Sequence, residues 1–426
     1  MKKIISIILC ICILASAAAL FSGCKKDGKD ADGPMAYILG EKGNTYSLGL
    51  AEEFKDEFEG LGGSVTMETF PTGTHNFSEF FSKAIDVNAE VIFLPNSIAN
   101  APDLLKNAKE MGISVPILAG DTWESPVVLE AVKDTGLEVY VTAFFDEGDT
   151  SEKAAEFVSG FKKYVIDYYD MNGGTDKVSS VCALGFDAYN VTLDAISRAA
   201  DKKGSALTSN DVAEELWATD CQGVTGKITF DKNGDAIKDR AYIKKAAADG
   251  TAFEFVKAQT VENNAKKAQS PGYAKGGVTI DTDNKRITVG VYEATTGDDC
   301  AGGKQELLGI MYAHELRKTV TIDGEEYEIH LCISDNGSLK EYSLAAATKR
   351  VDEGSIAVIG SYGSGVSIAA APVFEKACIP AVGASCTNAE VTAGNSYYFR
   401  TTILDAAQCE AMADFAFTLI DTDKAE

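Results

Sequence analysis

Residues 356–402 read IAVIGSYGSGVSIAAAPVFEKACIPAVGASCTNAEVTAGNSYYFRTT. An apolar run leads into the glycine-rich segment 360–365, and an alanine-rich stretch with helical character follows it. A second apolar run then ends in the polar segment 384–388. Short apolar strands that alternate with single helices are typical of a parallel sheet covered by helices on both faces. This stretch therefore predicts an α/β, doubly wound fold.

The same alternation recurs in two other parts of the chain. Between residues 36 and 118, apolar runs alternate with amphipathic stretches such as the one that carries Leu50, Phe54 and Phe58. The pattern resumes after residue 284 and continues into the C-terminal quarter. A chain of this length suggests more than one domain. We therefore expect two lobes, each built on a doubly wound parallel sheet, with a ligand cleft between them.

The N-terminal segment has the composition of an export signal. Lys2 and Lys3 precede an apolar run, and the small-residue stretch that follows ends in Cys24. This pattern predicts a lipoprotein signal peptide over residues 1–24, with lipidation at Cys24. The alternatives are a plain signal peptide or a short membrane anchor. The polar, charged segment 25–33 is predicted to be a flexible tether.

Charge and cysteine content exclude several classes of function. The formal net charge of −25 argues against nucleic acid and against a polyanionic substrate. Seven cysteines follow Cys24, but none forms a CxxC pair and their spacings are wide, which argues against zinc. We expect no cofactor and no metal, and the sequence leaves any disulfide pairing open.

Several motifs together resemble the branched-chain amino acid (Leu/Ile/Val-binding) family of periplasmic solute-binding proteins, which are subunits of ABC importers. Segment 356–402 is similar to the first ligand-binding half of that family. The motifs YSLGLA at 46–51, LAGDTW at 118–123, ALGFDA at 183–188 and GVTG at 223–226 are similar to its second half. The second half comes first in this chain. The chain therefore resembles a circular permutant of the type I periplasmic-binding fold.

The resemblance implies a division of the chain into lobes. Residues 262–285 are rich in Lys, Asn and Gly, and we expect them to be a permutation linker between the usual C-terminus and the usual N-terminus of the family. Fully extended, such a segment spans up to about 80 Å, far more than the gap between surface termini of one domain. The expected lobe II comprises residues 34–145 and 239–261, and the expected lobe I comprises residues 146–238 and 286–426.

The resemblance also implies that an α-amino acid binds between the lobes. Ser364 and Thr387 match the residues that bind its carboxylate, and Ser385 lies where a backbone carbonyl faces its ammonium group. From the other lobe, Asp121 matches the acidic partner of the ammonium group. Tyr46 matches the aromatic residue that closes over the ligand. Fixed hydroxyl and carboxylate groups are the chemistry that a zwitterion requires.

Tyr362 and Trp123 lie beside these positions, and we expect them to shape the side-chain pocket. The family often has an aromatic residue near Gly302, whereas here the segment 296–303 is small and acidic. This departure leaves the side-chain preference open, and Asp298 or Asp299 favours a polar or cationic ligand.

Each motif has a structural alternative. The segment 360–365 is also compatible with a tight turn or a phosphate cradle, although it lacks the Lys-Ser/Thr of a P-loop. Asp121 taken alone is more often a helix cap, and Tyr46 a surface residue. The three histidines, His75, His314 and His330, lie near no motif that pairs them with a nucleophile, and neither HExxH nor GxSxG occurs.

We therefore expect a monomeric, exported lipoprotein on the cell surface or in the periplasm. The implied function is to capture an amino acid or a close analogue and deliver it to an ABC permease in the membrane, without catalysis. The competing classes are a ligand-sensing domain that feeds a membrane signalling partner and an amide-processing enzyme on the same fold.

Overall fold

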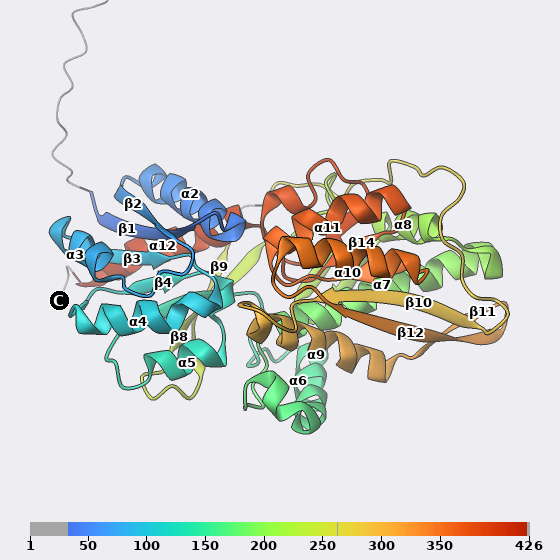
Figure 1. Ribbon diagram of the computed structural model, residues 1–426, viewed down its shortest axis with the longest axis horizontal. Coiled ribbons are helices and arrows are strands. Elements are labelled where there is room, and N and C mark those ends of the chain that lie inside the picture. The colour runs from blue at the N-terminus through green and yellow to red at the C-terminus, as the bar shows by residue number, and fades with distance from the viewer. Residues whose placement is uncertain (1–32, 262, 424–426) are drawn as a thin grey trace, which may run out of the picture.

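The computed structural model describes residues 33–261 and 263–423. Two lobes lie side by side, and each consists of a sheet flanked by helices (Figure 1). The predicted signal peptide, its Cys24 and nearly all of the predicted tether lie outside the described residues. No helix in the described part of the chain is both long and apolar enough to cross a membrane.

Lobe II contains a seven-stranded sheet with the strand order β2-β1-β3-β4-β5-β8-β9. Its strands are β1 (Met35–Lys42), β2 (Ser64–Pro71), β3 (Val91–Leu94), β4 (Ile117–Ala119), β5 (Val139–Ala143), β8 (Arg240–Ala246) and β9 (Phe253–Thr260). Its helices are α2 (Thr45–Gly60), α3 (Ser78–Asp86), α4 (Ala101–Glu110), α5 (Pro126–Val132) and the C-terminal α12 (Asp405–Asp423). The first five strands are parallel, whereas β8 and β9 pair antiparallel at one edge.

Lobe I contains a six-stranded sheet with the strand order β11-β12-β10-β13-β14-β15. Its strands are β10 (Arg286–Glu293), β11 (Thr319–Ile322), β12 (Glu325–Asp335), β13 (Ala357–Ile359), β14 (Ala381–Gly383) and β15 (Tyr398–Arg400). Its helices are α6 (Glu152–Tyr164), α7 (Ser180–Lys203), α8 (Ser209–Trp217), α9 (Cys300–Leu316), α10 (Lys340–Asp352) and α11 (Ser364–Ala377). Only β11 runs antiparallel, at the edge.

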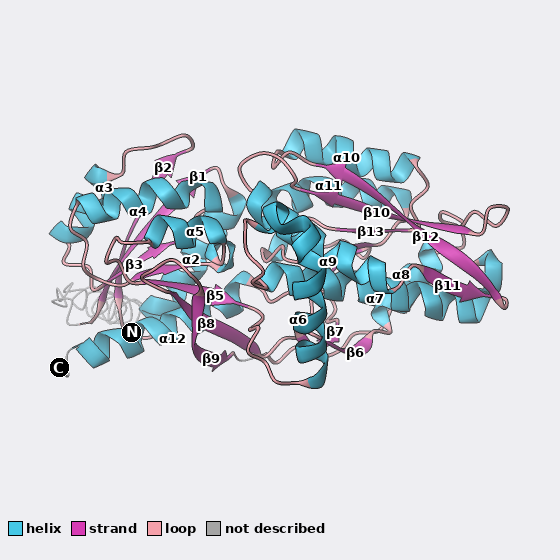
Figure 2. Ribbon diagram, turned by 90° about the horizontal axis from the view of Figure 1, so that it is seen from below, coloured by secondary structure: helices cyan, strands magenta, loops and turns pink. Residues whose placement is uncertain are grey.

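Short elements complete the chain. A two-stranded hairpin is formed by β6 (Asp220–Gly223) and β7 (Gly226–Thr229). Five short 3-10 helices are η1 (Ile98–Asn100), η2 (Asp121–Trp123), η3 (Val165–Asn172), η4 (Gly204–Ala206) and η5 (Ala389–Val391). Figure 2 shows the helices on both faces of the two sheets.

Burial explains why these segments form these elements. All residues of β3 and β4 are buried, as expected for central strands of a parallel sheet that is covered on both faces. On α2, Leu50, Phe54 and Phe58 recur every four residues and are fully buried, so one stripe of the helix packs against the sheet. The predicted α/β class is confirmed, with antiparallel strands added at the sheet edges.

The C-terminal helix α12 packs on lobe II, although the sequence-based division assigned 286–426 to lobe I. Its Met412, Phe415 and Ile420 are buried in one cluster with Ala36 and Phe54. The chain therefore crosses between lobes at 401–404, and not at its C-terminus as the family order suggested. Both described ends of the chain, β1 and α12, lie on lobe II (Figures 1 and 2).

The predicted linker 262–285 is anchored to lobe I along part of its length. The hydroxyl of Tyr273 donates to the carbonyl of Ser396 at 2.5 Å and accepts from Trp217 Nε1 at 2.7 Å. The ring of Tyr273 also packs on Tyr397, with ring centroids 4.8 Å apart. Val278 exchanges hydrogen bonds with the backbone and hydroxyl of Ser209. The predicted linker therefore packs on lobe I over part of its length.

The cysteines of the described residues are all free. Cys182, Cys386 and Cys409 are buried, and burial raises the pKa of each thiol. These thiols behave as small core side chains.

Candidate functional site: the cleft between the lobes

A cavity of about 670 Å³ lies between the two lobes and is lined by the ends of strands from both sheets. It contains six of the seven residues that the sequence predicted for the ligand, namely Tyr46, Asp121, Tyr362, Ser364, Ser385 and Thr387. Ligands of doubly wound sheets bind at the carboxyl ends of the strands, and the cavity has that position in both lobes.

Trp123 is the predicted residue that does not line the cavity. Its side chain is fully buried in the core of lobe II, and its Nε1 donates to the carbonyl of Asn96 at 2.9 Å. Trp123 therefore anchors the loop that carries Asp121 and does not shape a side-chain pocket.

One part of the cavity lining, which includes Ser364 and Thr387, is rich in hydrogen-bond donors. Ser364 begins α11, so its hydroxyl and the free N–H groups of the first turn lie together at the positive end of a 14-residue helix. The Ser364 hydroxyl accepts from the backbone N–H of Asn388 at 3.2 Å, which leaves its proton available to a ligand. Thr387 is 1% exposed and its Oγ1 has no hydrogen-bond partner within the described protein. This part of the lining suits a carboxylate.

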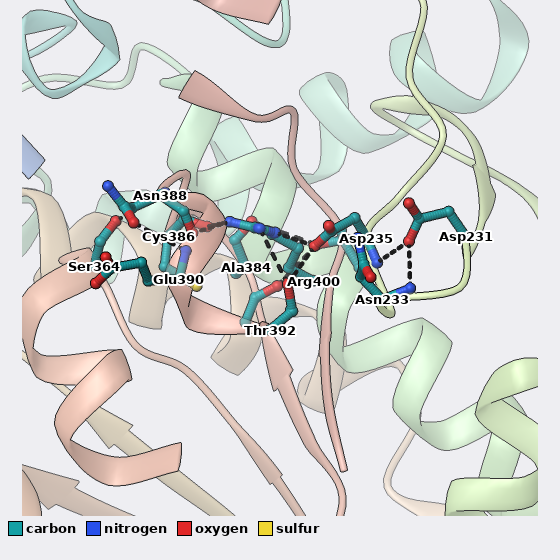
Figure 3. Close-up of polar contacts among 12 residues, drawn as sticks. Asp231, Asn233, Asp235, Ser364, Ala384, Cys386, Asn388, Glu390, Thr392 and Arg400 are labelled. Carbon is teal, nitrogen blue, oxygen red and sulfur yellow. Dashed lines mark hydrogen bonds and ion pairs between the residues drawn. The ribbon is translucent and has the colours of Figure 1, made fainter. Parts of the chain in front are cut away.

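A buried arginine fixes the loop that carries Thr387. Arg400 is fully buried and donates to the carbonyls of Cys386 and Asn388 at 3.1 and 2.6 Å. Its Nε pairs with Oδ1 of Asp235 at 2.6 Å. Figure 3 shows the guanidinium between the 386–388 loop and the turn that holds Asp235. The pair therefore holds the 386–388 loop in position, and neither Arg400 nor Asp235 lines the cavity.

Another part of the cavity lining, which includes Asp121, is acidic. Asp121 is buried and its Oδ1 accepts from the Tyr46 hydroxyl at 3.0 Å. Burial, and then the charge of Asp405, raise the pKa of Asp121 to about 7. Burial likewise raises the pKa of Asp405 to about 6. Two buried carboxyl groups that repel each other favour the binding of a cation, because the cation stabilises the ionised form of both.

A second acidic pair lies behind Ser385. The Ser385 hydroxyl donates to Oε2 of Glu306, and Oε2 of Glu293 accepts from the backbone N–H of Tyr362 at 2.9 Å. Both glutamates are fully buried, and Oε1 of each lacks a partner among the described residues. Burial and the charge of Glu306 raise the pKa of Glu293 well above its ordinary range. Burial beside Glu306 therefore favours the protonated form of Glu293.

The structure also identifies cavity residues that the sequence analysis did not select. Glu41 ends β1 and lines the cavity from lobe II, and Lys340 lines it from the start of α10. Neither residue lies in a motif, and only the position of a strand end or a helix start could have suggested them. Among the described residues, no cluster of His, Cys, Asp and Glu has the geometry to hold a metal ion.

The sequence matches a known family over most of its length. The family model described as periplasmic binding protein matches residues 17–251 and 286–422. The chain belongs to the periplasmic binding protein family. A search of curated proteins finds no match.

Solved structures of similar proteins come from several bacteria. The leucine-binding protein LivK of Thermotoga maritima is 28% identical, with 55% of this chain and 62% of that chain covered and a TM-score of 0.44. The branched-chain amino acid transporter substrate-binding protein LivJ of Streptococcus pneumoniae, in complex with isoleucine, is 23% identical, with 54% and 61% covered and a TM-score of 0.43. The chain thus spans less than two thirds of the length of these two proteins. A solute-binding protein of Clostridium phytofermentas with bound L-rhamnose is 11% identical, with 92% and 82% covered and a TM-score of 0.39.

Proposed function

We propose that this periplasmic binding protein captures an amino acid or a close analogue in its interlobe cleft and delivers it to an ABC permease. The observation that carries the proposal is the chemical polarity of the cleft. A helix N-terminus with two hydroxyl groups, those of Ser364 and Thr387, and the buried carboxyl of Asp121 line the same cavity. A zwitterion complements both kinds of group at once.

The remaining residues have roles that fit this ligand. Tyr46 contacts Asp121 through its hydroxyl and so orients the carboxylate toward the cavity. Ser385 and Tyr362 line the cavity together with Ser364. Both are held by the buried Glu293 and Glu306.

We further propose that the protein acts outside the cytoplasm as a lipoprotein anchored through Cys24 and works as a monomer. The N-terminal sequence supports export, and the family has periplasmic members. The tether 25–33 then attaches the anchor to lobe II, because β1 begins at Met35 on that lobe. We also propose that the order of the lobes is circularly permuted, which the location of both described chain ends on lobe II supports.

Two other functions remain as alternatives. A sensing role uses the same cleft and differs only in the membrane partner. An enzymatic role finds its one supporting observation at the rim, where Nδ1 of His75 lies 2.8 Å from Oδ2 of Asp103. The His75 side chain is largely exposed and contacts no hydroxyl nucleophile in the described protein, so we favour binding without turnover.

The proposal is tested by calorimetry with ligand-stripped protein against the twenty amino acids and their simple amides. We expect one ligand to bind per chain, with no release of ammonia from amides on prolonged incubation. Heat from none of these ligands would contradict the amino acid assignment. Turnover of an amide that stops in His75→Ala would favour the enzyme.

A further inference from the structure

Most of the charged side chains that line the cleft are acidic. Six carboxyl groups line it against the single ammonium group of Lys340. The six belong to Glu41, Asp103, Asp121, Asp298, Asp299 and Glu341. Asp103 is engaged by His75, and Asp298 and Glu341 are exposed at the rim, where water solvates them. Water does not solvate Glu41 and Asp299 to the same extent, because Glu41 is 6% exposed and Asp299 is half-buried.

Glu41 of lobe II and Asp299 of lobe I line the same cavity. Burial, then the charges of Asp298 and Glu41, raise the pKa of Asp299 to about 6, while the Ser97 hydroxyl of lobe II lowers it. The amides of Asn44 and Asn100 both donate to Oε2 of Glu41, at 3.1 and 3.0 Å, so neither amide occupies Oε1. A cation between the two carboxylates removes their mutual repulsion.

This acidic pair is separate from the carboxyl of Asp121. Tyr362 lies within electrostatic reach of both, since burial and then the charges of Asp299 and Asp121 raise the pKa of its phenol. The ring of Tyr362 occupies the space over Gly302, where a Cβ would lie 2.2 Å from the ring. Gly302 therefore makes room for the ring of Tyr362, which lines the cavity, and aromatic rings suit both aliphatic chains and cations.

We propose that the ligand of this cleft is an α-amino acid with a second positive charge at the end of its side chain. This inference rests on the proposed function and deepens it. The carboxylate binds at Ser364 and the unpartnered hydroxyl of Thr387, and the α-ammonium group binds at Asp121. The aliphatic part of the side chain passes Tyr362, and the distal cation binds between Asp299 and Glu41.

The test compares ligands that differ in the distal charge alone. L-Lysine and L-norleucine share the backbone and a linear side chain, but only lysine carries a terminal ammonium group. Calorimetry on ligand-stripped full-length protein should give an affinity for lysine at least about 10-fold higher, the value of one charge-assisted hydrogen bond. L-Arginine and L-ornithine extend the series, because they place the distal charge farther out and closer in.

Two variants test the location of the distal site, and a third is their control. Asp299→Asn and Glu41→Gln should each weaken lysine binding by about 10- to 150-fold and leave norleucine binding within about twofold. The matched control is Glu254→Gln, which makes the same change of charge on the exposed edge strand β9. It should leave the affinity for both ligands unchanged.

The outcomes separate this inference from the proposed function. Norleucine, leucine or isoleucine binding as tightly as lysine would overturn the inference and leave the proposed function intact. Unchanged lysine binding in both Asp299→Asn and Glu41→Gln would also overturn it. Binding of cadaverine, which lacks the carboxylate, with no binding of any amino acid would contradict the proposed function itself.

Discussion

The loops that follow β4 and β14 occupy corresponding places in the two lobes and have opposite chemistry. In lobe II, β1 lies between β2 and β3, and β4 lies next to β3. In lobe I, β10 lies between β12 and β13, and β14 lies next to β13. After β4 the loop presents Asp121, a buried carboxyl. After β14 the loop presents Ser385 and Thr387, two hydroxyl groups, beside the N-terminus of α11. Two copies of one architecture thus carry the groups that the proposed zwitterion site requires.

The two loops are also held in place by different means. Trp123 anchors the β4 loop from the apolar core, with one hydrogen bond to Asn96. Arg400 anchors the β14 loop through a buried ion pair with Asp235 and two loop carbonyls. An apolar anchor tolerates substitution better than a buried charge, because a buried charge without its partner is costly. The lobe I loop should therefore be the more sensitive of the two.

The largest effect is expected from breaking the arginine anchor. Asp235→Ala leaves the guanidinium of Arg400 buried and unpaired, so we expect a loss of about 3–5 kcal/mol in the free energy of unfolding. Asp194→Ala is the control, because its ion pair with Arg317 at 2.9 Å is partly exposed and should contribute about 1 kcal/mol or less. Urea unfolding measures both variants. Equal losses in the two would show that Arg400 does not anchor the loop.

The next effect is a loss of affinity at each end of the ligand. Asp121→Ala and Ser364→Ala each remove a charge-assisted hydrogen bond, and we expect affinity for the amino acid to fall by about 10- to 150-fold. Isothermal titration calorimetry gives the affinity, and circular dichroism checks that the fold is retained. Wild-type affinity in both folded variants would mean that the ligand binds elsewhere.

The acidic part of the cavity lining should also make binding depend on pH. An ammonium group binds the ionised form of Asp121, whose pKa in the free protein is raised to about 7. Affinity should therefore fall by up to about tenfold per pH unit below 7. In Asp121→Asn this part of the dependence should be lost.

The same carboxyl has the opposite effect on the stability of the ligand-free protein. Its pKa is higher in the folded state than in the unfolded state, so the folded state holds the extra proton between about pH 4 and pH 7. Stability therefore falls as pH rises through that range and stays lower above it. Asp121→Asn should raise the melting temperature at pH 8 more than at pH 5. An equal change of the melting temperature at both pH values would mean that Asp121 is ionised throughout this pH range.

The smallest effect is expected from restoring the family order of the lobes. Joining Glu426 to Pro34 by a short linker and opening the chain at 264–266 leaves Tyr273 attached to lobe I. We expect affinity within about twofold and a melting temperature within a few degrees, since contacts within each lobe are unchanged. Loss of binding by a folded, reordered protein would show that the present order is part of the site.

The sequence could locate residues in the segments that follow apolar strands. Asp121, Ser364 and Thr387 all lie within a few residues of a strand end, and the carboxyl ends of parallel strands meet at one edge of a sheet. Trp123 could not be assigned in this way. It lies two residues after Asp121 in the 3-10 helix η2, where side chains two residues apart point in different directions.

Contacts between distant segments could not be predicted from the sequence. The apolar residues of α12 predict a buried helix, but they do not indicate which sheet the helix covers. Glu41 and Asp299 come from opposite lobes, and their proximity depends on how the lobes face each other. Tyr273 contacts Ser396 and Tyr397, which are distant in the chain, so the sequence could not indicate that segment 262–285 packs on lobe I.

We propose that the loops after β4 and β14 bind the ammonium and the carboxylate group of one amino acid. A crystal structure of the protein with the amino acid that binds most tightly in calorimetry tests this arrangement. We expect the ligand carboxylate to lie within hydrogen-bond distance of the Ser364 and Thr387 hydroxyl groups, with the α-ammonium group at Asp121. A ligand bound in the reverse orientation, or outside the cavity between the lobes, would contradict it.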